Sequence, residues 1–258
     1  MSKELIRLEH GGGGKLMRLL LENVVIPSFT LQRVKGGIGL PEEDDGATIP
    51  IGDSYLVLTT DSHTIKPIFF PGGDIGRLAI SGTINDLSVM GAKPIAITSA
   101  IVIEEGFHVQ QLKRILKSMN DTLMEIGTPL VAGDTKVVER GGIDGILITT
   151  AGVGHTHTPI LDSGLKPGDL MILTGPIGNH EIALLSQREG LKFETRLKSD
   201  VAPLWNMVEP ALKSGRITSM KDPTRGGFAG TLNEMARKSH VDIIVREKRV
   251  PVDEEVRG

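Results

Sequence analysis

Carboxylates stand beside glycines or at the predicted ends of strands and helices in four stretches of the 258-residue sequence. These stretches are EEDDGA with Asp44 and Asp45, LTTDSHT with Asp61, TINDLSVMG with Asp86, and VAGDTKVV with Asp134. Acids at the ends of different elements can converge in a fold, where they repel one another unless cations lie between them. Mg²⁺ takes oxygen ligands and commonly bridges carboxylates to phosphate oxygens. The four stretches therefore favour a magnesium site beside a phosphate group.

Asp86 is the acid that local structure explains least. Apolar residues at helical spacing predict a helix from about 74 to 90, and small residues within it favour close packing of a neighbouring element. A carboxylate near the end of this helix faces the negative pole of the helix dipole, which costs about 0.3 kcal/mol or more. The other acids keep a simpler alternative, because aspartate is common in turns and helix caps, as expected at Asp53, Asp74 and Asp169.

The glycine run HGGGGKL gives a second candidate for phosphate binding. It fails the Walker A template, because Glu9 stands where that template has glycine and Leu16 stands where it has serine or threonine. Backbone N–H groups at Gly12 and Gly13, with Lys15, could still close over a polyphosphate. A mobile linker is the equally simple alternative.

The stretch KDPTRGGF, from 221 to 228, predicts a turn that opens a helix. Arg225 and the backbone N–H of Gly226 could receive an anion there. The alternative is a proline-led helix start with close packing at the glycines.

Seven histidines occur in the sequence, and no two of them fall at metal-ligand spacing on a predicted helix. Most are interpreted as surface or core residues. His63, two residues after Asp61, is the histidine placed to take part in chemistry.

Composition limits the classes of protein that need to be considered. The net charge is −3 and 39% of the residues are hydrophobic, which is typical of a globular protein and disfavours binding to a nucleic-acid backbone. No apolar run reaches the length of a membrane span, and no secretory signal is visible, so we expect a cytoplasmic protein. The sequence has no cysteine, which excludes disulfides, thiolate metal sites and a cysteine nucleophile within these residues.

Periodicity predicts an α+β domain with one layer of helices on a sheet. The expected strands of the first half lie at 47–51, 55–61, 95–103, 129–132 and 145–153, and the expected helices at 74–90 and 109–126. A turn-rich stretch at 155–169 marks a boundary. Beyond it we expect strands at 170–173, 217–220 and 241–246 and helices at 179–189, 201–213 and 227–238. The predicted units are a flexible glycine-rich arm (1–40), an N-terminal domain (41–155) and a C-terminal domain (156–258).

Five stretches together resemble the HypE family of hydrogenase maturation proteins: HGGGGK, DDGATIP, TDSHTIKPIFFPGGDIGRLAISGTINDLSVMGAKP, AGDTKVV and KDPTRGGF. This family is part of the superfamily of aminoimidazole ribonucleotide synthetase, selenophosphate synthetase and thiamine-monophosphate kinase. The resemblance covers essentially the whole chain. It implies a two-domain fold whose N-terminal domains form a homodimer through a barrel of joined sheets, with the nucleotide near that junction. The C-terminal α/β domain would be incomplete.

The resemblance also implies ATP and Mg²⁺ as cofactors and a set of site residues. The implied metal ligands are Asp44, Asp45, Asp61, Asp86 and Asp134. Lys136 matches the family's functional lysine, with a solvated residue at a strand edge as the alternative, and His63 is the other catalytic candidate. Candidate nucleotide contacts in the matching motifs are Gly12, Gly13, Lys15, Asp61, Gly73, Asp86, Gly133, Asp134, Thr135, Arg225 and Gly226.

The implied activity is an ATP-dependent dehydration. The partner HypF attaches a carbamoyl group to a cysteine at the protein's own C-terminus, and ATP activates the carboxamide oxygen. Loss of phosphate gives a thiocyanate, whose cyanide reaches the iron of a [NiFe] hydrogenase through the HypC–HypD complex.

The sequence departs from this family pattern after the KDPTRGGF stretch. It has neither the family's ANEG-like segment nor its cysteine-ending tail. We therefore expect either a fragment of a longer protein, which the last residues favour, or a shortened homologue that has lost the reaction. The alternative functions are a non-catalytic ATP-binding scaffold and a superfamily phosphotransferase such as thiamine-monophosphate kinase, against which HGGGGK and GDTKVV argue.

Overall fold

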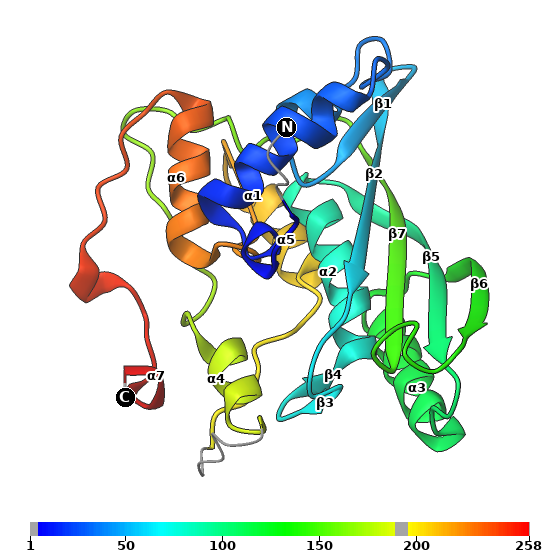
Figure 1. Ribbon diagram of the computed structural model, residues 1–258. Helices are drawn as coiled ribbons and strands as arrows, with labels where there is room; N and C mark the ends of the chain where they lie inside the picture. Colours follow the sequence, from blue (N-terminus) through cyan, green and yellow to red (C-terminus); the bar gives the residue numbers. More distant parts are fainter. Residues whose placement is uncertain (1–4, 189–195, 258) are drawn as a thin grey trace.

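A five-stranded mixed sheet forms one side of the molecule in the computed structural model, which describes residues 5–188 and 196–257 (Figure 1). Its strands run in the order β1-β2-β7-β5-β6, and only the β5–β6 pair is parallel. Their bounds are β1 Ala47–Ile51, β2 Ser54–His63, β5 Lys93–Glu104, β6 Leu130–Val138 and β7 Ile146–Thr156. The turn expected at Gly52 and Asp53 joins β1 to β2, with Gly52 at a φ of 59° that favours glycine.

Two helices cover one face of this sheet, α2 (Ile75–Val89) and α3 (Val109–Ile126). Ile80, Ile84 and Leu87 of α2 are fully buried in the main core, where each such side chain contributes about 1.5–3 kcal/mol of transfer free energy. Asp74 caps α2, because its Oδ1 accepts hydrogen bonds from the N–H groups of Gly76 (2.8 Å) and Arg77 (3.0 Å). The α+β class with one helical layer is therefore confirmed.

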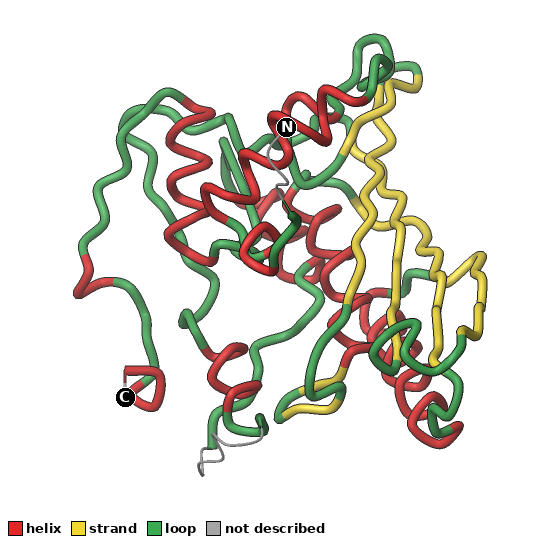
Figure 2. Tube along the Cα trace, viewed as in Figure 1, coloured by secondary structure: helices red, strands yellow, loops and turns green. Residues whose placement is uncertain are grey.

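Helices and loops make up the described part of the chain after β7 (Figure 2). The helices are α4 (Asn179–Leu185), α5 (Trp205–Ser214), α6 (Gly227–Ser239) and the short α7 (Glu254–Arg257), with a 3₁₀ turn at Glu247–Arg249. Trp205 and Val208 of α5 join the core formed by α2 and the sheet. Side chains of α2 also hold the segment before α5, since Asn85 donates to the Ala202 carbonyl (3.1 Å) and accepts from the Leu204 N–H (2.8 Å).

The strands predicted at 170–173, 217–220 and 241–246 are wrong, because the structure shows none of these segments as a strand. Leu170, Ile172 and Ile244 are 87–91% exposed. A strand needs neighbours that accept and donate its backbone hydrogen bonds, and β propensity alone does not supply them. Neither of the two sheets in the described part of the chain includes these segments.

The predicted N-terminal arm is folded into short helical pieces over its described residues. These are a 3₁₀ turn at Leu8–Gly11, α1 (Gly14–Leu20), a π turn at Leu21–Val25 and 3₁₀ turns at Ile26–Ser28 and Leu40–Glu42. A small two-stranded sheet, β3 (Phe69–Phe70) and β4 (Gly73–Asp74), precedes α2. No described helix is long and apolar enough to cross a membrane.

Candidate functional site

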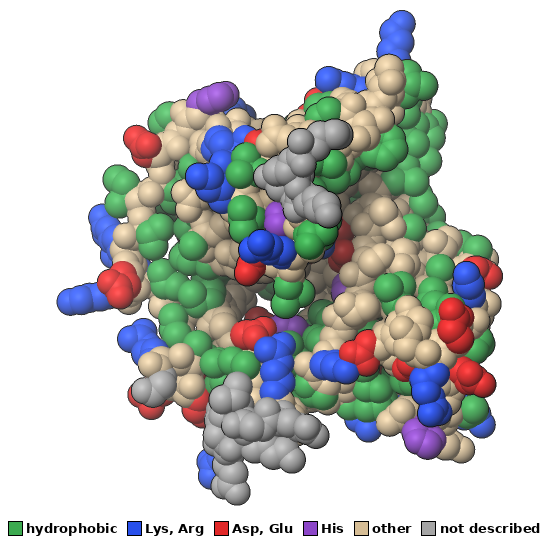
Figure 3. All heavy atoms as spheres, viewed as in Figure 1, with side chains coloured by type: hydrophobic (Ala, Val, Ile, Leu, Met, Phe, Trp, Pro, Cys, Tyr) green, Lys and Arg blue, Asp and Glu red, His purple; other side chains and the backbone are tan. Residues whose placement is uncertain are grey.

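Four acids from separate elements converge on one place in the fold. Asp45 lies in the loop before β1, Asp61 on β2, Asp86 in the last turn of α2, and Asp222 in the loop before α6. Burial raises the pKa of Asp86 well above its ordinary value, and the charges of Asp222, Asp45 and Asp61 raise it further. The predicted convergence of Asp45, Asp61 and Asp86 is therefore present within a single chain. Figure 3 shows acidic and histidine side chains within the recess between the sheet side and the helical side of the molecule.

Asp86 is held by one short hydrogen bond. Its Oδ2 accepts from the Thr59 hydroxyl of β2 at 2.7 Å. One turn earlier, Gly82 leaves room for β2, because a Cβ there would lie 3.0 Å from Asp61 Oδ2 and 3.1 Å from His63 Nε2. The small residues of this helix thus bring the β2 acid and the helical acid together.

Asp61 differs from its neighbours because a histidine and an arginine both lie beside its carboxylate. His63 Nε2 lies 3.3 Å from Asp61 Oδ2, and an Arg225 guanidinium nitrogen lies 3.6 Å from Oδ1. Burial alone would raise the pKa of Asp61, but the hydrogen bond and charge of His63, and then the charge of Arg225, lower it overall. The site therefore holds one carboxylate that is readily ionised beside others that resist ionisation.

Asp222 is a site residue that sequence reasoning missed. It is 8% exposed, and burial, followed by the charge of Asp45, raises its pKa to about 7. In the stretch KDPTRGGF the sequence pattern predicts an anion site at the arginine and glycine and assigns no role to the acid. Its acid, three residues before Arg225, was the available signal.

The raised pKa of Asp222 predicts a pH-dependent stability. The folded chain holds a proton between about pH 4 and pH 7 that the unfolded chain has released, so raising the pH through that window weakens the fold. Asp222→Asn removes this dependence. The difference in free energy of unfolding between variant and wild type should grow across the window by up to about 4 kcal/mol and then level off. Urea unfolding of the ligand-free chain at pH 4.5, 6 and 8 measures it, and a constant difference would contradict the assignment.

The AGDTKVV stretch lies apart from these acids in the chain. Gly133, Asp134, Thr135 and Lys136 lie on β6, an edge strand whose described side chains are mostly exposed. Strand β6 is three positions from β2 in the sheet, a separation of about 14 Å. One copy of the chain therefore does not bring Asp134 to Asp61 and Asp86.

The glycine arm reaches the site through the turn before α6. Gly13 has a φ of 78°, and a Cβ there would lie 2.3 Å from the Gly226 nitrogen. Gly226 precedes α6 directly and follows Arg225, the partner of Asp61. Gly12 and Lys15 are exposed beside this contact, whereas Gly73 packs against Phe70 and Val201.

The donor set fits a hard cation that is shared with an oxyanion ligand. Among the described residues, no three histidine or acidic side chains could hold a metal ion by themselves. Asp45 Oδ2 is buried without a hydrogen-bond partner, and the buried Asp222 and the partly buried Asp86 are acids that a cation would stabilise in their charged form. Asp44 is turned elsewhere, because its Oδ1 accepts from the Asp162 N–H at 3.1 Å, and burial, then the charge of Asp162, raises its pKa to about 7.

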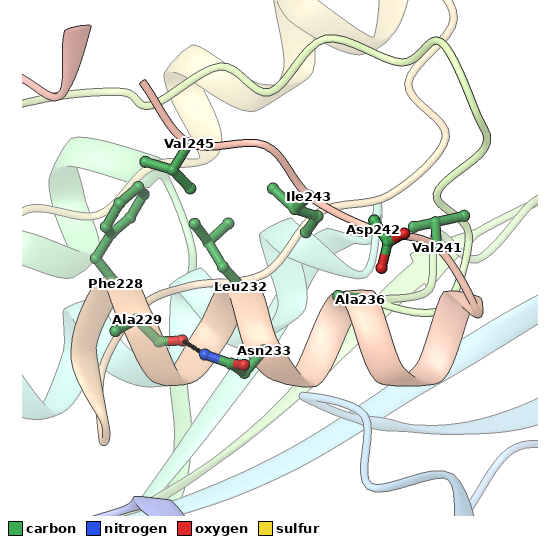
Figure 4. A pocket seen from close by; sticks show the side chains of 9 residues that line it. All are labelled: Phe228, Ala229, Leu232, Asn233, Ala236, Val241, Asp242, Ile243 and Val245. Atoms are coloured by element: carbon green, nitrogen blue, oxygen red, sulfur yellow. Dashed lines mark hydrogen bonds between the residues drawn. The ribbon is translucent and has the colours of Figure 1, made fainter. Parts of the chain in front are cut away.

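A separate hollow of about 450 Å³ lies between α6 and the segment after it. Figure 4 shows Phe228 and Leu232 of α6 facing Ile243 and Val245 across it. Its lining is largely apolar and contains none of the converging acids.

Comparison with known proteins places two family domains on this chain. Residues 43–156 match the family described as AIR synthase related protein, N-terminal domain, and residues 166–257 match the corresponding C-terminal domain. A putative hydrogenase expression/formation protein of Methanocaldococcus jannaschii is 51% identical over 96% of this chain and 75% of its own length. Carbamoyl dehydratase HypE of Cupriavidus necator is 41% identical over 96% of this chain and 70% of its own length.

Solved structures give the same relationship. HypE in a HypE–HypF complex superposes with a TM-score of 0.84 at 44% identity, covering 92% of this chain and 76% of that one. HypE in complex with ATP superposes with a TM-score of 0.77 at 38% identity, covering 98% and 74%. Thiamine monophosphate kinase from Aquifex aeolicus shares the fold at 19% identity and a TM-score of 0.69, over 94% and 80%.

Proposed function

This chain belongs to the HypE family of AIR synthase-related proteins, and from that premise we propose that it uses ATP and Mg²⁺ to dehydrate a sulfur-bound carboxamide to a thiocyanate. The observation that carries the proposal is the convergence of the buried acid Asp222 and the partly buried acids Asp45 and Asp86 beside the Asp61–Arg225 pair. Buried carboxylates next to an anion-receiving turn suit a metal-bound polyphosphate. A related HypE structure contains ATP, which supports the same ligand here.

The reaction balances as R–S–C(=O)NH₂ plus ATP giving R–S–C≡N, ADP, inorganic phosphate and a proton. The carboxamide oxygen takes the γ-phosphoryl group, two N–H protons leave, and the C–O bond breaks with phosphate as the leaving group. For this reaction the protein must neutralise the charge of the phosphate groups and hold the carboxamide oxygen in line with the γ-phosphate bond that breaks. Because the 258 residues contain no cysteine, the sulfur that carries the carboxamide lies outside them.

The chain's own groups divide this work. Mg²⁺, when bound, would neutralise phosphate oxygens, and the nucleotide would share it with carboxylates from the set Asp45, Asp61, Asp86 and Asp222, since no three described acids could hold a metal ion by themselves. Arg225, which is 59% exposed, and the N-terminus of the 13-residue helix α6 are placed to receive phosphate oxygens. His63 keeps Asp61 oriented, and its Nδ1 is buried without a hydrogen-bond partner.

Asp134 and Lys136 require a second copy of the chain in this proposal. They lie on the exposed edge strand β6, away from the acids of their own chain. A homodimer that joins the sheets would bring β6 of one chain toward the acids of the other. Lys136 would then reach the transferred phosphoryl group as a catalytic cation. A HypF-type carbamoyltransferase is the proposed donor partner, since a HypE relative forms a complex with HypF. The cytoplasmic location and the HypC–HypD acceptor remain predictions.

The proposed activity is tested by supplying the carboxamide on a separate molecule. A short peptide that ends in S-carbamoylcysteine is incubated with the chain, ATP and Mg²⁺, and the peptide mass is followed. Loss of 18 mass units from the peptide, with one ADP formed per peptide, is the expected result. ATP consumption without the peptide change, or thiamine-phosphate turnover instead, would support the phosphotransferase alternative, whose present support is a likeness of fold. Nucleotide binding with neither reaction would support the scaffold alternative.

Gly13→Ala is expected to raise the dissociation rate of ATP about tenfold, because the added methyl group cannot fit against Gly226 and the arm must leave the turn. Gly12→Ala is the matched control, since a Cβ there meets only the Glu9 carbonyl oxygen, at 3.9 Å. Stopped-flow displacement of a fluorescent ATP analogue measures both rates. Equal rates in the two variants would show that the glycine run acts as a linker instead of a phosphate lid.

A further inference from the structure

Lys221 joins a buried and a partly buried carboxylate from distant parts of the chain. Its Nζ lies 3.0 Å from Asp45 Oδ1 and 3.0 Å from Asp162 Oδ2, and its side chain is 9% exposed. Asp45 belongs to the loop before β1, whereas Asp162 lies in the turn-rich segment after β7. Lys221 itself directly precedes the site residue Asp222. One ammonium group therefore connects the acid site to the segment between the two family domains.

Asp162 is the centre of this network. It is fully buried, and its Oδ2 also accepts from Lys238 of α6 at 2.7 Å. Lys238 donates in addition to the Glu43 carbonyl at 2.6 Å, and the Asp162 N–H donates to Asp44 Oδ1 at 3.1 Å. The loop 43–45 is thus tied at three successive residues to Asp162 or to a lysine that Asp162 holds.

These contacts leave one oxygen of the Asp45 carboxylate without a hydrogen-bond partner. Oδ1 is bound by Lys221, while Oδ2 is buried and has no hydrogen-bond partner. Lys221 directly precedes Asp222 in the chain, so the Asp45 carboxylate that it binds lies beside the loop that carries this site acid. A carboxylate fixed by one oxygen presents the other in a defined direction, as partners behind metal ligands commonly achieve. Glu234, 3.7 Å from Lys221, is the remaining acid of the network and is 42% exposed.

We propose that Asp162 and Lys221 are positioning residues, which fix the Asp45 carboxylate so that its free oxygen can serve the cation that enters with ATP. Neither residue touches the nucleotide; both act through Asp45. This inference rests on the proposed function, because it assumes that a divalent cation and ATP bind together at the acids. It assigns the segment between the family domains a part in cation binding.

The test is a Mg²⁺ titration of ATP binding by calorimetry on the whole chain. Asp162→Asn, which keeps the side-chain shape, and Lys221→Met are expected to need about tenfold more Mg²⁺ for half-maximal ATP binding. ATP affinity at saturating Mg²⁺ should stay within about threefold of wild type, and Lys221→Arg should restore most of the Mg²⁺ dependence. Lys213→Met is the matched control, since that lysine pairs with Glu209 on the surface of α5 and is 72% exposed.

The outcomes distinguish failure of the positioning role from failure of the proposed function. An unchanged Mg²⁺ requirement in a folded Asp162→Asn variant overturns the positioning role, whereas a wild-type chain that binds no ATP overturns the proposed function itself. If both variants unfold, amide hydrogen exchange is measured on the wild-type chain instead. Mg²⁺ with ATP should then slow exchange at the Asp162 N–H, which is bonded to Asp44, and an unchanged rate overturns the inference.

Discussion

Replacing Asp86 by asparagine is expected to weaken ATP binding in the presence of Mg²⁺ by at least about 100-fold, which corresponds to about 2.7 kcal/mol. The Asp86 carboxylate is the partly buried acid on which the charges of Asp45, Asp61 and Asp222 all act, so it lies where a cation would neutralise the group. Asparagine keeps the shape and can still accept from the Thr59 hydroxyl. It cannot supply the negative charge that draws Mg²⁺ into the site.

The same substitution should stabilise the ligand-free chain. Burial first, and then the neighbouring acids, raise the pKa of Asp86. At neutral pH the folded state therefore either holds an unfavourable charge at Asp86 or binds a proton there, and both reduce its stability relative to the unfolded state. An amide removes that cost, and the melting temperature should rise by roughly 3 °C for each kcal/mol gained. Asp121→Asn is the control, since Asp121 pairs with Lys117 on the exposed face of α3. Unchanged calorimetric affinity for ATP, or lower stability of the ligand-free variant, would contradict the assignment of Asp86.

Replacing Lys136 by methionine is expected to lower the rate of thiocyanate formation about 1000-fold while ATP affinity changes less than about threefold. Lys136 lies on the edge strand β6, apart from the buried acids of its own chain, so it contributes little to holding the nucleotide there. In the proposal, Lys136 stabilises only the negative charge that develops on the phosphoryl group during its transfer. Lys117→Met, on the exposed face of α3, is the matched control.

Mixing two inactive variants shows whether the site is shared between chains. If Lys136 serves the acids of a partner chain, random pairing of Lys136→Met and Asp86→Asn chains gives mixed dimers with one intact site. Such a mixture should recover about a quarter of wild-type activity. No recovery after verified subunit exchange would place Lys136 in the site of its own chain and would contradict the shared site. A loss of ATP binding in Lys136→Met alone would assign the lysine to nucleotide affinity instead.

The first half of the fold could be predicted because local signals and tertiary packing agree there. Helix α3 begins and ends where its apolar spacing predicts, with Ile115, Met119 and Leu123 buried and Gly127 closing it at a φ of 72°. Asp74 caps α2 as expected. Helix α2 is one residue shorter at each end than predicted, and Asp86 in its last turn lies near the other converging acids, as its unusual position predicted.

The second half could not be predicted in the same way, because strand formation there depends on neighbours that the local sequence does not specify. Segment 241–246 has strand-like residues, yet it runs beside α6 along the apolar hollow of Figure 4. The site shows the same limit. The sequence contexts of Asp45, Asp61 and Asp86 predicted that these acids converge, whereas Asp222, which follows a lysine in a turn, was not predicted. Only the fold shows that Asp134 lies on an edge strand, away from them.

The most direct test of the proposed reaction follows one oxygen atom. The carboxamide of an S-carbamoylcysteine peptide is labelled with ¹⁸O and incubated with the chain, ATP and Mg²⁺, and the inorganic phosphate is analysed by mass spectrometry. If the carboxamide oxygen attacks the γ-phosphoryl group, each thiocyanate formed leaves one ¹⁸O atom in phosphate. Unlabelled phosphate, with the peptide carboxamide intact, would show that water takes the phosphoryl group and would contradict the dehydratase account.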